Sequence, residues 1–554
     1  MNDRPPADLL ISGRVATLAG DSGFGWQPGL AVAGGRVVAV GRPDELEALC
    51  GPRTARWRLT DDQLVVPGIT DAHLHLMTLV LSAAQIDLTG LDLPAALAAV
   101  RLRHEQLSAA GDRDGWLLGH GWLAHDLGGW PDAALLEQAA PGRPVALYAH
   151  DHHSRWLSVA ALRAAAITGA AADLGGGLVR RDAAGDPTGI LHETATMLVE
   201  HAIPDPPPGQ VEQTLARVAN ELAALGITGC HDPGELTGDT RISRGPLLYR
   251  SLAEAGRLPL RVHAAVRAPQ LARAIELGLR SGQRVSRYTM GWLKLFADGS
   301  LGSRSAALLA PYTDAQANPP TGGPQGMYLT EPDELAELLR RAEEAGISGQ
   351  VHALGDAAVR AVLDIFAALP RTRDLPLMRR IEHAQLVDPA DQPRFGRLRV
   401  AASVQPVHLR SDAAQELIGW GDRAEHSFPL RGLIEGGALI PFGTDAPIEK
   451  PDPWPGLAVA VVRRDPTNPS AGTIGAAQAI DLARALRAAC LDPAIVAGDP
   501  ELGRLIPRSR ADLLVVPAAG FESAAFDGSA LSTTRPLATM LDGEIVHRDA
   551  RFEW

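Results

Sequence analysis

The segment Pro67-Gly-Ile-Thr-Asp-Ala-His-Leu-His75 decides the fold, because a short apolar run ends there in two histidines separated by one residue. Side chains alternate along a strand, so His73 and His75 point to the same side of it. Two imidazoles placed in this way suit the coordination of one metal ion. In a barrel of parallel strands and helices, functional side chains lie at the carboxyl ends of the strands.

The rest of the central region alternates apolar runs with alanine- and leucine-rich helical stretches, as expected of repeated β-α units around a parallel sheet. Together with the first strand, the candidate strands number eight, which is the number of a TIM barrel. We therefore predict an α/β fold, a distorted TIM (β/α)8 barrel. The further strands are expected at 226–231, 260–266, 292–296, 348–352, 380–383, 400–404 and 439–445.

Both ends of the chain carry short β-like runs broken by turns. Residues 1–65 and 495–554 are expected to form one composite β-sandwich domain, because strands from either end alone would leave open edges. Residues 66–494 form the predicted barrel domain. The stretch of about 80–215 is longer than one helix requires, so we expect an α/β insertion after the first strand that roofs the site.

The composition limits which partners and which cellular location we expect for the protein. Hydrophobic residues make up 46% and charged residues 21%, as in an ordinary globular protein. A formal charge of −13 disfavours nucleic acid and anionic lipid as partners, and no apolar run is long enough for a membrane span. We expect a cytoplasmic protein, because no secretory signal is evident. The expected partner is a small molecule, with a homodimer as the candidate assembly.

Four further polar residues stand at the ends of predicted strands: Lys294, His352, His383 and Asp445. Lys294 is notable because only two of the 52 basic residues are lysines, and an amine can lose its proton where a guanidinium cannot. Each residue alone has a structural explanation, such as a buried histidine or a turn aspartate. Together with His73 and His75 they predict a metal centre, because burying so many polar groups without partners is costly. Zinc suits this mixture of imidazole and carboxylate.

At this point the sequence resembles the amidohydrolase superfamily, and within it amidohydrolase family 3, the branch of YtcJ-like proteins and N-substituted formamide deformylases. The resemblance covers nearly the full length. The motifs that carry it are Pro67–His75, Lys294-Leu-Phe-Ala-Asp-Gly-Ser-Leu-Gly-Ser-Arg304, Val351-His-Ala-Leu-Gly-Asp356, Ile381-Glu-His-Ala-Gln385, Ser403-Val-Gln-Pro406 and Phe442-Gly-Thr-Asp445.

The resemblance implies a metal site made of the five histidine and aspartate positions, with Lys294 at the position that is carboxylated in binuclear members. We therefore expect two divalent ions, with zinc as the default. His73, His75 and Asp445 would hold one ion, His352 and His383 the other, and a carbamate on Lys294 would bridge them. Asp445 is expected to take a proton from the attacking hydroxide and return it to the leaving nitrogen.

Three residues are predicted to contact substrate. Asp151-His-His-Ser-Arg-Trp-Leu-Ser158 resembles the family pattern Asp-Gly-His-x-x-Trp-x-Asn, which makes His153 the candidate functional histidine, for catalysis as well as binding. It departs from that pattern at His152 and Ser158. Arg304 and Trp122 are the further candidates for substrate contact.

The predicted activity is hydrolysis of an amide-type carbon–nitrogen bond other than a peptide bond, in an N-formyl, N-acyl or related small molecule. Two alternatives stay open within enzymes: a mononuclear site with unmodified Lys294, and a lyase or isomerase on the same metal scaffold. A non-catalytic amidohydrolase-like scaffold is the alternative from another class. Fold and metal site do not select the substrate.

Overall fold

The computed structural model describes residues 6–83, 85–150, 152, 154–169, 177–206, 208–235, 244–316, 320, 322–370, 375–468, 470, 472–522 and 526–553. The chain forms two compact units. The first consists of 1–74, 219–234 and 244–554, and the second consists of 75–218 and 235–243. The prediction for His153 lies outside the described residues.

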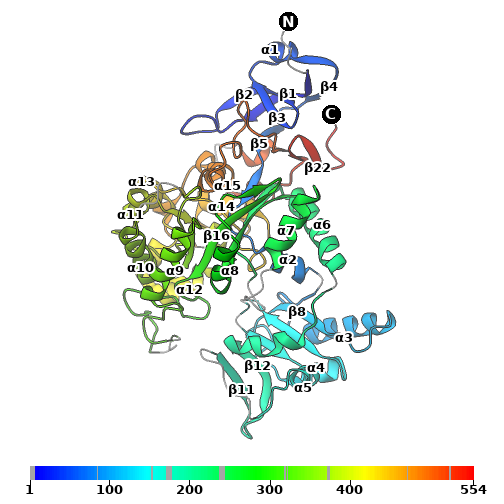
Figure 1. Cartoon of the computed structure of the whole chain (residues 1–554), viewed down its shortest axis with the longest axis vertical. Helices are drawn as coiled ribbons and strands as arrows, with labels where there is room; N and C mark the ends of the chain where they lie inside the picture. Colours follow the sequence, from blue (N-terminus) through cyan, green and yellow to red (C-terminus); the bar gives the residue numbers. More distant parts are fainter. Residues whose placement is uncertain are drawn as a thin grey trace. The chain divides into compact units, whose positions relative to one another are not determined.

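A curled sheet of parallel strands forms the centre of the first unit (Figure 1). The strands run in the order β19-β18-β17-β16-β14-β13-β6. The short β15 (Arg284–Val285) pairs in the antiparallel sense with the first two residues of β16. Most positions of these strands are buried, as expected of a parallel sheet covered on both faces. The strands are β6 (Ile69–Asp71), β13 (Ile227–Asp232), β14 (Arg261–Arg267), β16 (Tyr288–Phe296), β17 (Gly349–Ala353), β18 (Arg380–His383) and β19 (Ala401–Ser403).

The eighth predicted strand, 439–445, is corrected by the structure to an extended segment that is not a regular strand. It pairs with β19 through a single parallel bridge between Val404 and Phe442. Pro441 has no N–H to donate to a ladder, which accounts for the irregularity. The segment still reaches both edges of the sheet, because Gly443 N donates to Val404 O at 3.1 Å and Ala72 N donates to Phe442 O at 2.9 Å.

Helices follow most strands and cover the sheet. In α9 the local signals agree with the structure: Pro332 opens the helix, Asp333 and Glu334 stand in its first turn, and Arg341 stands in its last turn. The helices of the unit are α1 (Pro43–Glu47), α7 (Arg244–Glu254), α8 (Leu271–Glu276), α9 (Pro332–Glu344), α10 (Asp356–Ala368), α11 (Gln392–Leu398), α12 (Leu409–Trp420), α13 (Leu430–Glu435), α14 (Pro453–Val462), α15 (Leu482–Val496) and α16 (Ser529–Ser532).

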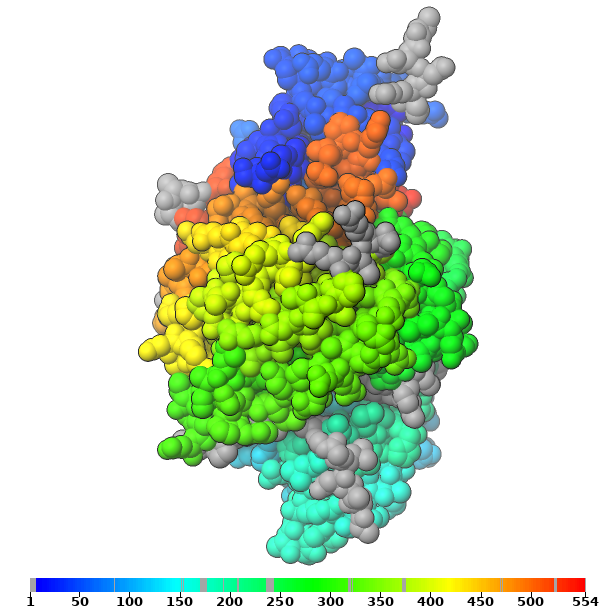
Figure 2. Space-filling view, turned by 60° about the vertical axis from the view of Figure 1, so that its left-hand side comes forward, coloured from blue at the N-terminus to red at the C-terminus, as the bar shows by residue number. Residues whose placement is uncertain are grey.

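The two ends of the chain share a second sheet within the same unit. Its order is β22-β21-β20-β5-β1-β2-β3, with β4 also paired to β1, so the strands of both chain ends form one branched sheet. Residues of both branches, such as Trp57 and Met540, belong to one hydrophobic core cluster, and the arrangement of the branches as a sandwich stays a prediction. Figure 2 shows amino-terminal residues, in blue, beside carboxyl-terminal ones, in orange. The strands are β1 (Ala7–Ala16), β2 (Trp26–Ala33), β3 (Arg36–Val40), β4 (Cys50–Arg58), β5 (Gln63–Pro67), β20 (Leu513–Pro517), β21 (Ala538–Leu541) and β22 (Glu544–Arg548).

The second unit covers most of the region where the sequence predicts an insertion. A six-stranded sheet runs in the order β11-β12-β10-β9-β8-β7. Its elements are α2 (Leu76–Ser82), β7 (Ile86–Asp87), α3 (Leu93–Ala109), β8 (Leu117–Trp122), α4 (Ala133–Ala139), β9 (Val145–Ala149), β10 (Ser154–Leu157), α5 (Val159–Ala164), β11 (Gly177–Arg181) and β12 (Pro187–Glu193), while α6 (Pro208–Ala224) continues into the first unit.

None of the helices in the described part of the chain has both the length and the apolar character needed to cross a bilayer.

Candidate metal centre

The turn after β6 is fixed to the segment before Asp445 by a buried carboxylate. Asp71 accepts hydrogen bonds from the backbone N–H groups of His73, at 3.1 Å, and Thr444, at 3.0 Å, and from the Thr444 hydroxyl at 2.6 Å. Asp445 N donates in turn to His73 O at 2.7 Å. Gly443 is required here, since a Cβ at that position would lie 2.5 Å from His73 N. The backbone therefore brings the first and last segments of the sheet together.

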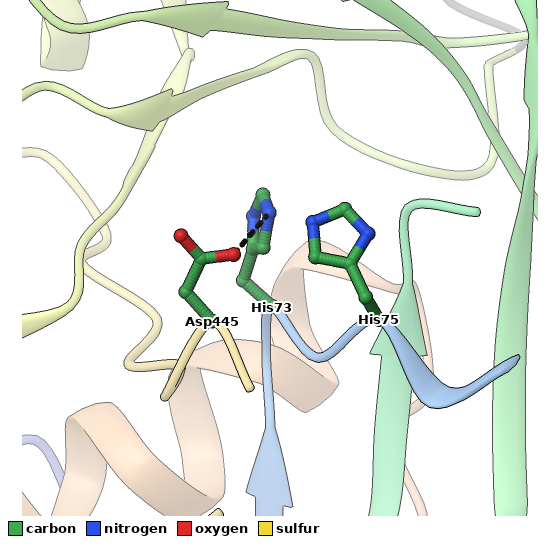
Figure 3. Close-up of side chains that lie close together, drawn as sticks. All are labelled: His73, His75 and Asp445. Carbon is green, nitrogen blue, oxygen red and sulfur yellow. Dashed lines mark ion pairs between the residues drawn. The ribbon is translucent and has the colours of Figure 1, made fainter. Parts of the chain in front are cut away.

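His73, His75 and Asp445 form a buried cluster at this point (Figure 3). One ligand atom from each lies within 4.8 Å of the others. Nε2 of His73 is 3.5 Å from Oδ1 of Asp445. Two imidazoles and a carboxylate converging in this way match the donor types and number that a catalytic zinc site takes from protein.

The fifth- and sixth-strand histidines lie beside this cluster. The ring centroids of His352 and His383 are 4.5 Å apart, and that of His383 is 5.0 Å from His73. His383 has a positive φ of 70°, so the backbone turns sharply at the end of β18. The structure thus brings five of the six predicted ligands together: His73, His75, His352, His383 and Asp445.

Lys294, the sixth predicted ligand, is 1% exposed on β16, and its Nζ lies 4.8 Å from the centroid of the Phe296 ring. Burial lowers the pKa of Lys294 to about 8, against the opposing effect of the carboxylates of Glu382 and Asp445. A neutral amine is therefore accessible near neutral pH, as carboxylation by carbon dioxide requires.

Three of the site histidines, His73, His352 and His383, are held in the neutral state. Burial and the neighbouring Lys294 lower the pKa of His73 to about 4 and that of His352 to about 3, and burial and His352 lower the pKa of His383. A neutral imidazole keeps a lone pair on one ring nitrogen, which is the form that binds a metal.

Each of three histidines also has one ring nitrogen directed at an oxygen acceptor. Nδ1 of His73 donates to Glu382, Nδ1 of His383 donates to Oε1 of Gln405 at 2.8 Å, and Nε2 of His352 donates to Gly299 O at 3.0 Å. Because these oxygens only accept, the proton is placed on that nitrogen and the other one keeps the lone pair. The acceptors thus fix the tautomer of each histidine, and with it the nitrogen that can bind an ion.

Sequence reasoning missed three polar residues at this site: Glu382, His408 and Asp298. His408 Nε2 lies 3.5 Å from Oδ2 of Asp445. Asp298 Oδ1 lies 3.6 Å from Nε2 of His352. A signal existed for all three, since Glu382 and Asp298 stand inside quoted motifs and His408 follows Ser403-Val-Gln-Pro406 by two residues.

Two predicted substrate contacts have partners of their own. Arg304 forms an ion pair with Asp314, and its guanidinium lies 4.7 Å from the centroid of the Tyr312 ring. Trp122 is 1% exposed, and its Nε1 donates to Leu147 O at 2.9 Å inside the core of the second unit. Substrate contact by either residue stays a prediction.

Comparison with known proteins gives concordant results. Residues 61–547 match the family described as "Amidohydrolase family". The putative amidohydrolase YtcJ of Bacillus subtilis is 30% identical, over 93% of this chain and 95% of its own. The N-substituted formamide deformylase of Arthrobacter pascens is 25% identical, over 92% and 93%. An uncharacterised metal-dependent hydrolase from Pyrococcus furiosus superposes with a TM-score of 0.71 at 25% identity, over 92% of this chain and 98% of that one.

Proposed function

Because the chain belongs to the amidohydrolase family, a family of metal-dependent hydrolases, we propose that it hydrolyses an amide-type carbon–nitrogen bond, other than a peptide bond, in a small molecule. The observation that carries this proposal is the buried cluster of His73, His75 and Asp445, with ligand atoms within 4.8 Å of one another. The formamide deformylase among the relatives supports an N-formyl or N-acyl compound as substrate.

The residues present fit a divalent ion, since two imidazoles and a carboxylate converge at one point. We propose that His73, His75 and Asp445 hold one zinc ion and that His352 and His383 hold a second, with a carboxylated Lys294 between them. When bound, such ions supply Lewis-acid chemistry, lowering the pKa of water towards ~7 and polarising a carbonyl oxygen.

Asp445 is the proposed proton carrier. One of its oxygens faces His73 and the other faces His408, at 3.5 Å in each case, so the carboxylate is held between two imidazoles. In this position Asp445 accepts a proton from the attacking water and delivers it to the leaving nitrogen, a general base that becomes a general acid. Burial lowers the pKa of His408, but Asp445, Asp412 and Glu449 raise it, to about 9 on balance. His408 therefore lies where it can orient Asp445.

A mononuclear centre is the second candidate. Within the described ranges, His73, His75 and Asp445 are the one group of three histidine, cysteine or acidic residues with the required spacing, which favours a single ion. In that arrangement Lys294 stays an unmodified amine.

Metal analysis and a product screen test the proposal together. We expect two divalent ions per chain after purification with zinc, and release of formate or another carboxylate, together with an amine, from a panel of N-formyl and N-acyl compounds. One ion per chain would favour the mononuclear alternative. Hydrolysis of no compound by metal-loaded protein would count against the amide substrate, and absence of bound metal would remove the proposed centre altogether.

A further inference from the structure

We propose that Glu382 is a positioning residue for His73, and that its carboxylate, clamped by Arg380, strengthens metal binding at that histidine. The inference rests on the proposed metal centre. If it is correct, Glu382 and Arg380 contribute to metal affinity although neither is a metal ligand.

The first step concerns the direction of the hydrogen bond. Nδ1 of His73 can only donate to Glu382, because an ionised carboxylate has no proton to offer. The lone pair of the neutral ring is then on Nε2, the atom that faces Asp445. Glu382 therefore selects the tautomer of His73 that can bind an ion beside Asp445.

The second step concerns the fixed position of the carboxylate. Arg380 donates to both oxygens of Glu382, through Nε and, at 3.1 Å, through Nη2. Arg380 is itself anchored by bonds to His231 Nδ1 at 2.9 Å, Ala72 O at 2.6 Å and Ser403 Oγ at 2.7 Å. Both side chains of the pair are completely buried. The carboxylate cannot turn away from His73 without breaking this network.

The third step concerns charge. Of the three acceptors that orient site histidines, Gln405 and the Gly299 carbonyl are neutral, whereas Glu382 is ionic. A carboxylate bonded to one ring nitrogen increases the basicity of the other, and loss of such a partner typically lowers metal affinity ~10–100-fold. Of the three hydrogen bonds that orient site histidines, the one to His73 is thus the one made by a buried charged group.

The chain contains a matched control. Glu343 is also buried and accepts two bonds from a neighbouring arginine, Arg379, at 2.7 and 2.6 Å. That pair bonds to the backbone of 366 and 370 and to none of the site histidines. Glu343→Gln therefore removes an equivalent buried charge without touching His73.

The experiment compares Glu382→Gln with Glu343→Gln in the full chain. Zinc affinity is measured by competition with a chelator, and melting temperature is measured with and without zinc. We expect both variants to melt lower than the unchanged protein. Only Glu382→Gln should lose zinc affinity, by ~10–100-fold, with a smaller rise in melting temperature on adding zinc.

Equal zinc affinity in Glu382→Gln and Glu343→Gln would overturn the inference, whatever their stability. If Glu382→Gln does not fold, Glu382→Asp replaces it: the carboxylate retreats by one methylene, and an unreduced zinc affinity in that variant would also overturn the inference. Failure of the unchanged protein to bind zinc would instead contradict the proposed function, so the two failures are distinguishable.

Discussion

The strands of the curled parallel sheet carry two layers of side chains, one at their carboxyl ends and one further back along the strands. Both layers contain buried histidines. The rim layer consists of His73, Lys294, His352, His383 and Asp445, at or beyond the carboxyl ends of the strands. The inner layer consists of His231, His263 and Trp292, whose rings pack on one another at centroid distances of 4.9 to 6.2 Å. The strand register separates the layers, because Lys294 is level with Arg267 on β14, four residues beyond His263.

Burial alone does not distinguish the two layers, since it lowers the pKa of histidines in both. The direction of the hydrogen bonds does. Rim histidines donate to oxygen acceptors and keep a lone pair for an ion, whereas Nδ1 of His231 accepts a bond from Arg380 at 2.9 Å. A guanidinium only donates, so that lone pair is already used. The rim is prepared to bind a cation, and the inner layer is packed around an arginine.

The largest effect is expected from Lys294→Arg, which tests whether the rim needs an amine or only a positive charge. A guanidinium cannot form a carbamate, so the bridging ligand should be lost, with nearly all activity and one of the two ions. Lys450→Arg, at the exposed second lysine, is the control and should leave both unchanged. Normal turnover by Lys294→Arg would show that the carbamate is wrong.

The next effect is expected from Asp445→Asn, which keeps the shape of a rim side chain and removes its basicity. Turnover should fall by ~10²–10⁴-fold, because the amide cannot accept a proton usefully at neutral pH. Much of the metal should remain, since an amide oxygen can still coordinate. Metal content, melting temperature and turnover are measured on one preparation. If Asp445 only closed its turn, stability would fall while turnover per folded molecule stayed the same.

These comparisons also show how far the sequence could predict the site. Strand-end positions identified the rim because the alternation of side chains and the parallel arrangement fix where such residues gather. They could not identify Glu382, because the positive φ at His383 lets two consecutive residues both serve the site, against simple alternation. They also missed His408, whose place depends on the short helical turn 406–408 after β19.

The fold, like the site, could be predicted in part from the sequence. The positions of the parallel strands along the chain follow from local patterns of apolar residues and agree with the structure at β6, β13, β14, β16, β17, β18 and β19. The segment 439–445 differs because Pro441 has no N–H to donate, so the segment joins the sheet edges at Ala72 and Val404 through separate hydrogen bonds and one isolated bridge.

The smallest effect is expected from His263→Phe in the inner layer. Within the described part of the chain, Nε2 of His263 is buried without a hydrogen-bonding partner, so an apolar ring of similar size removes no bond there. Stability at neutral pH should change by less than ~1.5 kcal/mol, as in other conservative core substitutions. Zinc content and turnover should stay normal, because the residue lies below the rim. A loss of zinc would place the inner layer in the metal centre and end the distinction between the two layers.

The same variant should change the dependence of stability on pH. Burial lowers the pKa of His263 to about 3, below the value of about 6.5 in an unfolded chain. Between these values the unfolded chain binds a proton that the folded protein does not, so the stabilising effect of the neutral ring is complete above about 6.5 and is lost as the pH falls. One such proton contributes a slope of about 1.4 kcal/mol per pH unit, which His263→Phe should remove. The slope is measured by unfolding the metal-free protein at a series of pH values from about pH 7 to about pH 4. Equal slopes in the unchanged protein and in His263→Phe would show that His263 binds its proton as readily in the folded state as in the unfolded chain.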